Sequence, residues 1–141
     1  MSTDTEDHGR FRVLLVDDEP AVLDSLKRLL HREPHHVLTA ASGQQALELI
    51  RRERVDLVVS DEHMPFVSGT ELLTRISAEH PEIKRIILTG KADMAGVIRA
   101  INEGKVDRYL TKPVPADLFI RTIAETLRER EKEERVKAMA A

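Results

Sequence analysis

Acidic, hydroxyl and lysine side chains follow four of the five short apolar segments along the chain. Asp17 and Asp18 come directly after the first segment, Asp61 ends the third, and Thr89 and Lys112 end the fourth and fifth. Clustered carboxylates repel and raise one another's pKa, and a hard divalent cation such as Mg²⁺ relieves this repulsion. An ionised carboxylate can then act as a nucleophile while lysine and threonine bind phosphoryl oxygens. The pattern therefore indicates phosphoryl transfer onto an aspartate.

The elements that must position these groups are short apolar strands alternating with amphipathic helices. Strands are expected at 11–16, 35–40, 55–60, 83–89 and 106–110. Helices are expected to begin at Pro20, behind capping boxes at Ser42–Gln45 and Ser68–Glu71, at Asp93 and at Pro115. Five strand–helix pairs of about 20–25 residues each predict an α/β fold, a doubly wound five-stranded parallel sheet in a three-layer α/β/α sandwich.

The carboxyl ends of parallel strands meet at one rim of such a sheet, which is where ligands bind. Each aspartate taken alone has a simpler explanation, because an aspartate after a strand often caps the next helix. Complementary groups at four strand ends are much harder to obtain by chance. We therefore expect one site at this rim.

The composition excludes several other classes of function. The 141 residues include no cysteine, which excludes disulfides, thiolate catalysis and cysteine-ligated zinc. An aromatic content of 3% and a net charge of −3 argue against direct nucleic-acid binding. No apolar run approaches about 18 residues, and residues 1–10 lack an apolar signal-peptide core. We therefore expect no membrane association and a cytoplasmic location.

In combination, the motifs resemble the receiver domain of bacterial two-component response regulators. The matching residues lie within about residues 10–127 and are Val16-Asp17-Asp18-Glu19, Asp61 with Met64-Pro65, Thr89, and Lys112-Pro113. The resemblance implies a flavodoxin-like sheet with the strand order 2-1-3-4-5. It also implies Mg²⁺ as cofactor and a sensor histidine kinase or phosphotransfer protein as phosphodonor.

The resemblance assigns a role to each matched position. Asp61 is implied as the phosphoacceptor and Lys112 as the phosphate-binding lysine. The implied Mg²⁺ ligands are the carboxylates of Asp18 and Asp61, the main-chain carbonyl of His63, and Asp17 through a water. Thr89 is implied as the switch hydroxyl and Tyr109 as the switch aromatic.

Two further expectations concern the rim. The Lys112–Pro113 peptide is expected to be cis, because X–Pro bonds adopt cis most easily and the family usually has cis there. His63 and Lys91 stand two residues after the acceptor and two after Thr89. Both side chains are expected to overhang the site, crowd the attacking water and lengthen the life of the phosphoryl group.

The implied function is a phosphorelay switch. Phosphorylation would change the surface of the fourth helix, fifth strand and fifth helix, and so control an output protein or module. The only chemistry expected is the domain's own phosphorylation and dephosphorylation, so the chain is not expected to be an enzyme otherwise. The alternatives are a receiver piece of a larger signalling enzyme, such as a cyclic-dinucleotide phosphodiesterase or hybrid kinase, and a Mg²⁺-dependent phosphatase.

Three segments are expected along the chain: a flexible tail at 1–10, the receiver domain at 11–127 and a charged helical extension at 128–141. The extension is read either as a solvated helix end or as a linker to a partner module, with favourable pairs Glu131/Arg135 and Glu133/Lys137. If the chain forms a homodimer on activation, the switch surface is the expected contact. The histidines at 31, 35 and 36 are read as part of a surface loop rather than a metal site.

Overall fold

Strands and helices alternate along the chain as the sequence predicts. The structure is a computed structural model that describes residues 10–140. Its strands are β1 (Arg12–Val16), β2 (His36–Ala40), β3 (Leu57–Asp61), β4 (Lys84–Thr89) and β5 (Arg108–Thr111). Its helices are α2 (Pro20–Leu29), α3 (Gly43–Arg52), α4 (Gly69–Glu79), the 3₁₀ turn η1 (Lys91–Asp93), α5 (Met94–Asn102) and α6 (Ala116–Ala140). The tail predicted at 1–10 lies, apart from Arg10, outside the described residues.

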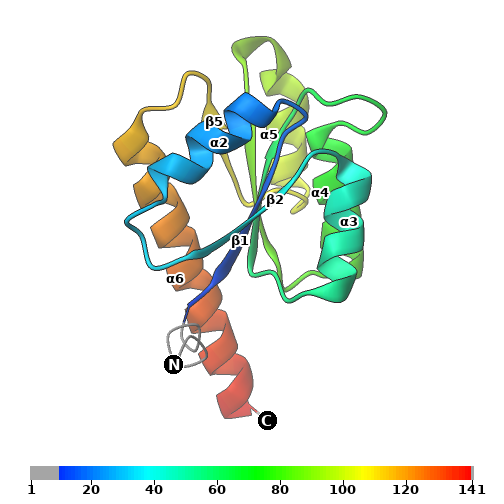
Figure 1. Cartoon of the computed structure of the whole chain (residues 1–141). Coiled ribbons are helices and arrows are strands. Elements are labelled where there is room, and N and C mark those ends of the chain that lie inside the picture. The colour runs from blue at the N-terminus through cyan, green and yellow to red at the C-terminus, as the bar shows by residue number, and fades with distance from the viewer. Residues whose placement is uncertain (1–9, 141) are drawn as a thin grey trace.

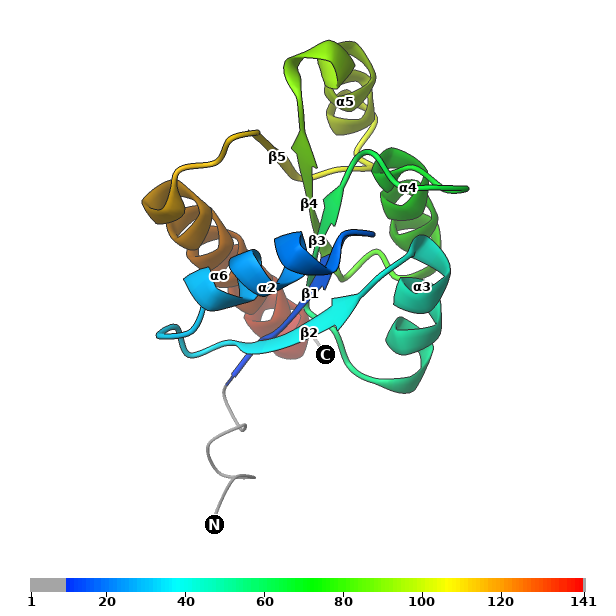
Figure 2. The same cartoon turned by 45° about the horizontal axis from the view of Figure 1, so that its top comes forward.

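The five strands form one parallel sheet in the order β2-β1-β3-β4-β5. The predicted strand order and three-layer architecture are therefore confirmed. Helices α2 and α6 cover one face of the sheet, and α3, α4 and α5 cover the other (Figures 1 and 2). In the register between β1 and the central strand β3, Val16 of β1 lies beside Ser60 of β3. The residues that follow Val16 and Ser60 therefore emerge next to each other.

Alternate strand residues build two apolar cores, as the period of two in a strand requires. Val13 and Leu15 of β1 belong to the core under α2 and α6, together with Phe119 and Ile123. Leu14 and Val16 belong to the core under the other three helices. With both faces buried, the sheet is a rigid base for its carboxyl-end rim.

Several predicted bounds differ from the observed ones by one or two residues. β5 begins at Arg108 rather than at 106, because the N–H groups of Lys105 and Val106 both donate to the Ala100 carbonyl. These bonds keep Val106 in the turn after α5. Helix α5 begins at Met94 rather than Asp93, because Lys91–Asp93 forms the separate turn η1.

The two predicted capping boxes differ in outcome. Ser68 Oγ accepts from the Glu71 N–H at 3.1 Å, and Glu71 Oε1 accepts from the Ser68 N–H at 3.0 Å. These two bonds complete the box of α4. Hydrogen bonding of the Glu71 carboxylate to the backbone N–H and the side chain of Ser68 lowers the pKa of Glu71. At α3, Ser42 Oγ accepts from the Gln45 N–H, but the Gln45 side chain accepts from Ala41, one residue before the cap.

Helix α6 continues without a break through the charged segment. The predicted pair Arg135–Glu131 forms at 3.5 Å, whereas Glu133 contacts Lys84 of β4 at 3.0 Å instead of pairing with Lys137. The extension is therefore not only a solvated helix end, because part of it binds the edge of the sheet where the strands begin. Among the described helices, none has the length together with the apolar composition needed to cross a membrane.

Candidate functional site

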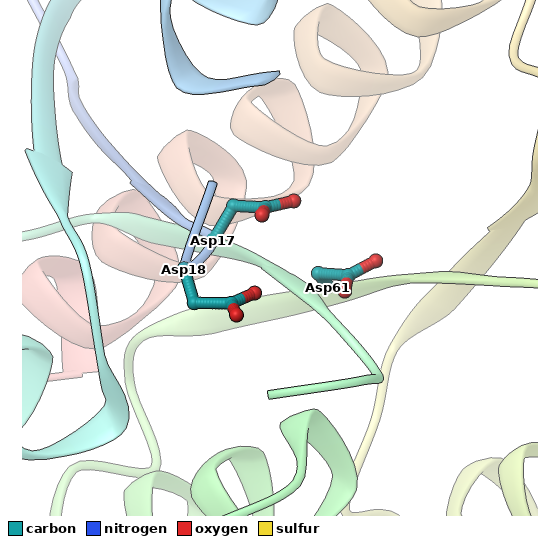
Figure 3. A group of neighbouring side chains, drawn as sticks. All are labelled: Asp17, Asp18 and Asp61. Atoms are coloured by element: carbon teal, nitrogen blue, oxygen red, sulfur yellow. The ribbon is translucent and has the colours of Figure 1, made fainter. Parts of the chain in front are cut away.

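Three carboxylates meet at the carboxyl-end rim of the sheet, between β1 and β3 (Figure 3). Asp17 and Asp18 follow the last residue of β1, and Asp61 is the last residue of β3. One carboxylate oxygen from each lies within 4.8 Å of one from each of the others. The predicted convergence of these residues is therefore confirmed.

The surroundings of Asp17 disfavour the ionised form of its carboxyl group. It is 2% exposed, and burial raises its pKa, with the neighbouring charges of Asp61 and Asp18 acting in the same direction. Its Oδ1 accepts from the Glu19 N–H at 2.9 Å, but its Oδ2 is buried without a hydrogen-bond partner. A buried, unpartnered oxygen beside two further carboxylates fits a hard divalent cation, which prefers oxygen ligands.

Lys112 lies against the central carboxylate of this group. Its Nζ forms an ion pair with Asp61 Oδ1, while Asp61 is 5% exposed and the lysine side chain is about half exposed. The N–H of Lys112 donates to the Thr89 carbonyl at 2.9 Å, which keeps the chain in register just beyond the end of β5. The Lys112–Pro113 peptide is cis, as predicted.

Thr89 and Tyr109 lie on the neighbouring strands β4 and β5. Thr89 is buried, and its hydroxyl donates to the Gly90 carbonyl at 3.2 Å. Tyr109 is 40% exposed and lines a groove of about 720 Å³ formed by α5, β5 and α6. This α5–β5–α6 surface, which also includes Ile101 and Leu118, corresponds to the surface predicted to switch.

His63 and Lys91 both lie at the same rim, in exposed positions. His63 Nε2 lies 2.6 Å from Asp93 Oδ2, so its ring contacts the end of η1. Asp93 was not among the predicted site residues. No sequence signal marks it, since an aspartate before a helix is ordinarily read as a cap.

The loop between β3 and α4 folds back against the end of β3, where Asp61 stands. A Cβ added to Gly69 would lie 2.2 Å from the main-chain oxygen of Asp61, so this position requires glycine. The Glu62 carboxylate accepts from the Thr70 N–H at 2.8 Å and from the Thr70 hydroxyl at 2.7 Å. Glu62 therefore holds the loop, a role that sequence reasoning missed because it depends on how the loop folds back.

Comparison with known proteins agrees with the geometry. The response regulator receiver domain family matches residues 13–124. The transcriptional regulatory protein GlrR of Escherichia coli (strain K12) is 38% identical over 120 residues, 85% of this chain and 27% of that protein. The signal receiver domain of an HD domain-containing protein from Pseudomonas fluorescens Pf-5 superposes with a TM-score of 0.82 at 36% identity, covering 87% and 98% of the two chains.

A third relative is a response regulator receiver domain protein (CheY-like) from Methanospirillum hungatei JF-1. Its TM-score is 0.82 at 36% identity, and the match covers 89% of this chain and 99% of that one. The chain spans about a quarter of the length of the first curated relatives it matches, 24% and 27%. The fold, the rim of carboxylates and the matched span lead to one conclusion: this chain belongs to the response regulator receiver domain family.

Proposed function

We propose that this receiver domain takes a phosphoryl group onto Asp61 from a phosphohistidine of a sensor kinase or phosphotransfer protein. The observation that carries the proposal is the ion pair of Lys112 with a nearly buried Asp61, beside Asp17 and Asp18. An Asp61 carboxylate oxygen attacks phosphorus, the O–P bond forms and the N–P bond breaks. The electron pair of that bond returns to the imidazole nitrogen of the donor, which takes up a proton.

The reaction needs a divalent cation at the three carboxylates, and we propose Mg²⁺. Asp18 and Asp61 would hold it through carboxylate oxygens, His63 through its main-chain carbonyl and Asp17 through a water. When bound, it supplies positive charge that offsets both the clustered carboxylates and the phosphoryl oxygens. The raised pKa of Asp17 and its unpartnered oxygen support this assignment.

The remaining residues respond to the new phosphoryl group. Lys112, which now pairs with Asp61, exchanges the carboxylate for a phosphoryl oxygen. Thr89 turns its hydroxyl from the Gly90 carbonyl to the phosphoryl group. Tyr109, 40% exposed on β5, then moves inward and changes the α5–β5–α6 surface.

The changed surface acts on an output protein or on a module of a longer protein. The second arrangement is favoured by the relatives, since the chain matches only about a quarter of the first curated ones. Helix α6 reaches Ala140 and would be the connection to such a module. If the domain dimerises when phosphorylated, the same surface is the proposed contact.

The decisive experiment is incubation with acetyl phosphate, with and without Mg²⁺, followed by intact mass measurement. We expect a gain of one phosphoryl group that needs Mg²⁺, is lost in Asp61→Asn and is weakened in Asp18→Ala. Equal labelling of Asp61→Asn would overturn the assignment. Sustained turnover of p-nitrophenyl phosphate, with a burst and then steady hydrolysis, would instead favour a Mg²⁺-dependent phosphatase.

A further inference from the structure

Phe66, in the loop between β3 and α4, combines two unfavourable features. Its side chain is fully exposed, at 104% of the reference area. Its φ is +70°, and within residues 10–140 it is the one non-glycine residue with positive φ. A bulky residue rarely adopts this conformation. An aromatic ring that stays exposed to water also forgoes the favourable free energy that burial would give it. Backbone strain of this kind persists where the surroundings enforce it, and it concentrates at functional sites.

The surroundings of Phe66 do enforce its position. Two neighbours in the loop, Met64 before it and Val67 after it, pack against the apolar core under α3, α4 and α5. The Val67 N–H donates to the Pro65 carbonyl at 2.8 Å, and the Gly69 N–H donates to Glu62 at 3.0 Å. The loop is thus fixed at both ends while its tip carries the exposed ring. In both cartoon views the loop between β3 and α4 projects outward from the body (Figures 1 and 2).

The tip of this loop lies close to the acceptor. Three Cα–Cα steps join Phe66 to Gly69, so their Cα atoms are at most about 11 Å apart. Gly69 in turn packs against the main chain of Asp61. A protein that binds through a patch of about 800 Å² covers a radius of about 16 Å. A protein donor centred on Asp61 is therefore large enough to reach Phe66, whereas a small phosphodonor is not.

We infer that Phe66 is a docking anchor for the protein that delivers the phosphoryl group, and that it inserts into an apolar recess near that protein's phosphohistidine. Aromatic side chains are enriched in the buried centres of protein interfaces. Inside such an interface the ring would lose the exposure that makes it unfavourable in the free domain. This inference rests on the proposed function, since it names a docking residue for the same transfer.

The test compares two donors on the intact chain. One is acetyl phosphate, and the other is an autophosphorylated histidine-kinase domain selected because it labels the wild-type chain. The variants are Phe66→Gly, Phe66→Ala and the conservative Phe66→Tyr. The matched control is Val136→Ala, which removes an exposed apolar side chain from α6. Thermal unfolding and sizing are measured for every variant.

We expect Phe66→Gly and Phe66→Ala to slow transfer from the kinase domain by at least about tenfold, as loss of an interface anchor does. Labelling of these variants by acetyl phosphate should stay within about twofold of wild type. The Phe66→Tyr variant, which keeps an aromatic ring, should accept the phosphoryl group from the kinase domain at close to the wild-type rate. The unfolding temperature of Phe66→Gly should not fall, because glycine adopts positive φ without strain. Val136→Ala should behave as wild type with both donors.

Three results would overturn the inference. Kinase transfer at the wild-type rate would show that the ring is not an anchor. Equal slowing with both donors would show that the ring acts on the loop geometry. A wild-type dimer that becomes monomeric only in the Phe66 variants, with transfer unchanged, would assign the ring to a second copy of the chain. None of these results touches the proposed function, which fails separately if acetyl phosphate does not label Asp61.

Discussion

The imidazole Nε2 of His63 lies 2.6 Å from Oδ2 of Asp93. The two residues belong to different loops of the rim, since His63 follows β3 and Asp93 ends the turn η1 after β4. The contact therefore links the loop that follows Asp61, the proposed phosphoacceptor, to the segment that follows Thr89. It holds the largely exposed imidazole at the rim, in the loop that begins directly after Asp61.

Removal of the His63 and Lys91 side chains is expected to speed loss of the phosphoryl group. Hydrolysis needs a water in line with the O–P bond, and we expect these two side chains to restrict the approach of that water. The double change His63→Ala with Lys91→Ala should raise the dephosphorylation rate severalfold, which is about 1 kcal/mol of barrier. Decay of the phosphorylated mass after removal of acetyl phosphate measures this rate.

Asp93 offers a control on the role of the histidine. Asp93→Ala should speed the decay in the wild-type background but add nothing to His63→Ala, because both changes remove the same obstacle. Slower decay in His63→Ala would instead mean that the imidazole assists the water, as a base would.

Thr89→Ala should separate phosphorylation from switching. The variant keeps Asp61 and Lys112, so it should still gain one phosphoryl group with acetyl phosphate. It lacks the hydroxyl that senses the group, so Tyr109 should not respond. Tyr109 is the only tyrosine in a chain without tryptophan, so its fluorescence reports this step directly. An equal change of fluorescence in variant and wild type would contradict the proposed coupling.

Asp17 is expected to lower stability at neutral pH in the absence of a divalent cation. Its pKa is raised, chiefly by burial, so between its ordinary and its raised pKa the folded state binds more protons than the unfolded state. The stability that Asp17 contributes is therefore lost as pH rises through this window. Asp17→Asn should raise the unfolding temperature at pH 7 by about a few degrees.

The advantage of Asp17→Asn should shrink as the pH falls toward 4, where the wild-type carboxyl becomes protonated. Thermal melts from pH 4 to 8 in EDTA measure this dependence. Asp18→Asn is the matched control, because Asp18 is exposed in the same cluster and should change the melts little. Addition of Mg²⁺ should stabilise the wild type more than Asp17→Asn. A constant difference between wild type and Asp17→Asn at every pH would contradict the argument.

Much of the site could be predicted because it follows from a simple geometric rule. Apolar runs at strand length determine the sheet, and parallel strands bring their carboxyl ends to one rim. Asp17, Asp18 and Asp61 each stand at a strand end, so their convergence needs no knowledge of loop conformation. The same holds for Lys112, whose position one residue beyond β5 brings it to Asp61.

The parts that could not be predicted depend on loop conformation and on contacts between distant residues. The pair His63–Asp93 joins two loops separated by 30 positions, and the positive φ of Phe66 belongs to a loop that no periodic pattern describes. The contacts of α6 are a similar case. Charges at nearly every position of 128–137 favour pairs within the helix, and the sequence does not reveal that Lys84 lies within reach of Glu133.

Arg130 on α6 is expected to stabilise the fold, although it stands in a segment that looks solvated. Its Nε lies 3.7 Å from Oδ1 of Asp56, a buried oxygen without a hydrogen bond, and the arginine side chain is only 12% exposed. Arg130→Ala would remove this contact, because the other arginine near Asp56, the largely exposed Arg54, lies 3.7 Å from Oδ2 rather than Oδ1. We expect a loss of about 1–3 kcal/mol in the free energy of unfolding, the usual penalty for a buried polar group that loses its partner.

Arg135→Ala is the matched control on the same helix, since its pair with Glu131 is exposed and should contribute less than about 1 kcal/mol. Urea denaturation of the two variants measures both values, and equal small losses would show that α6 beyond Leu127 does not support the domain.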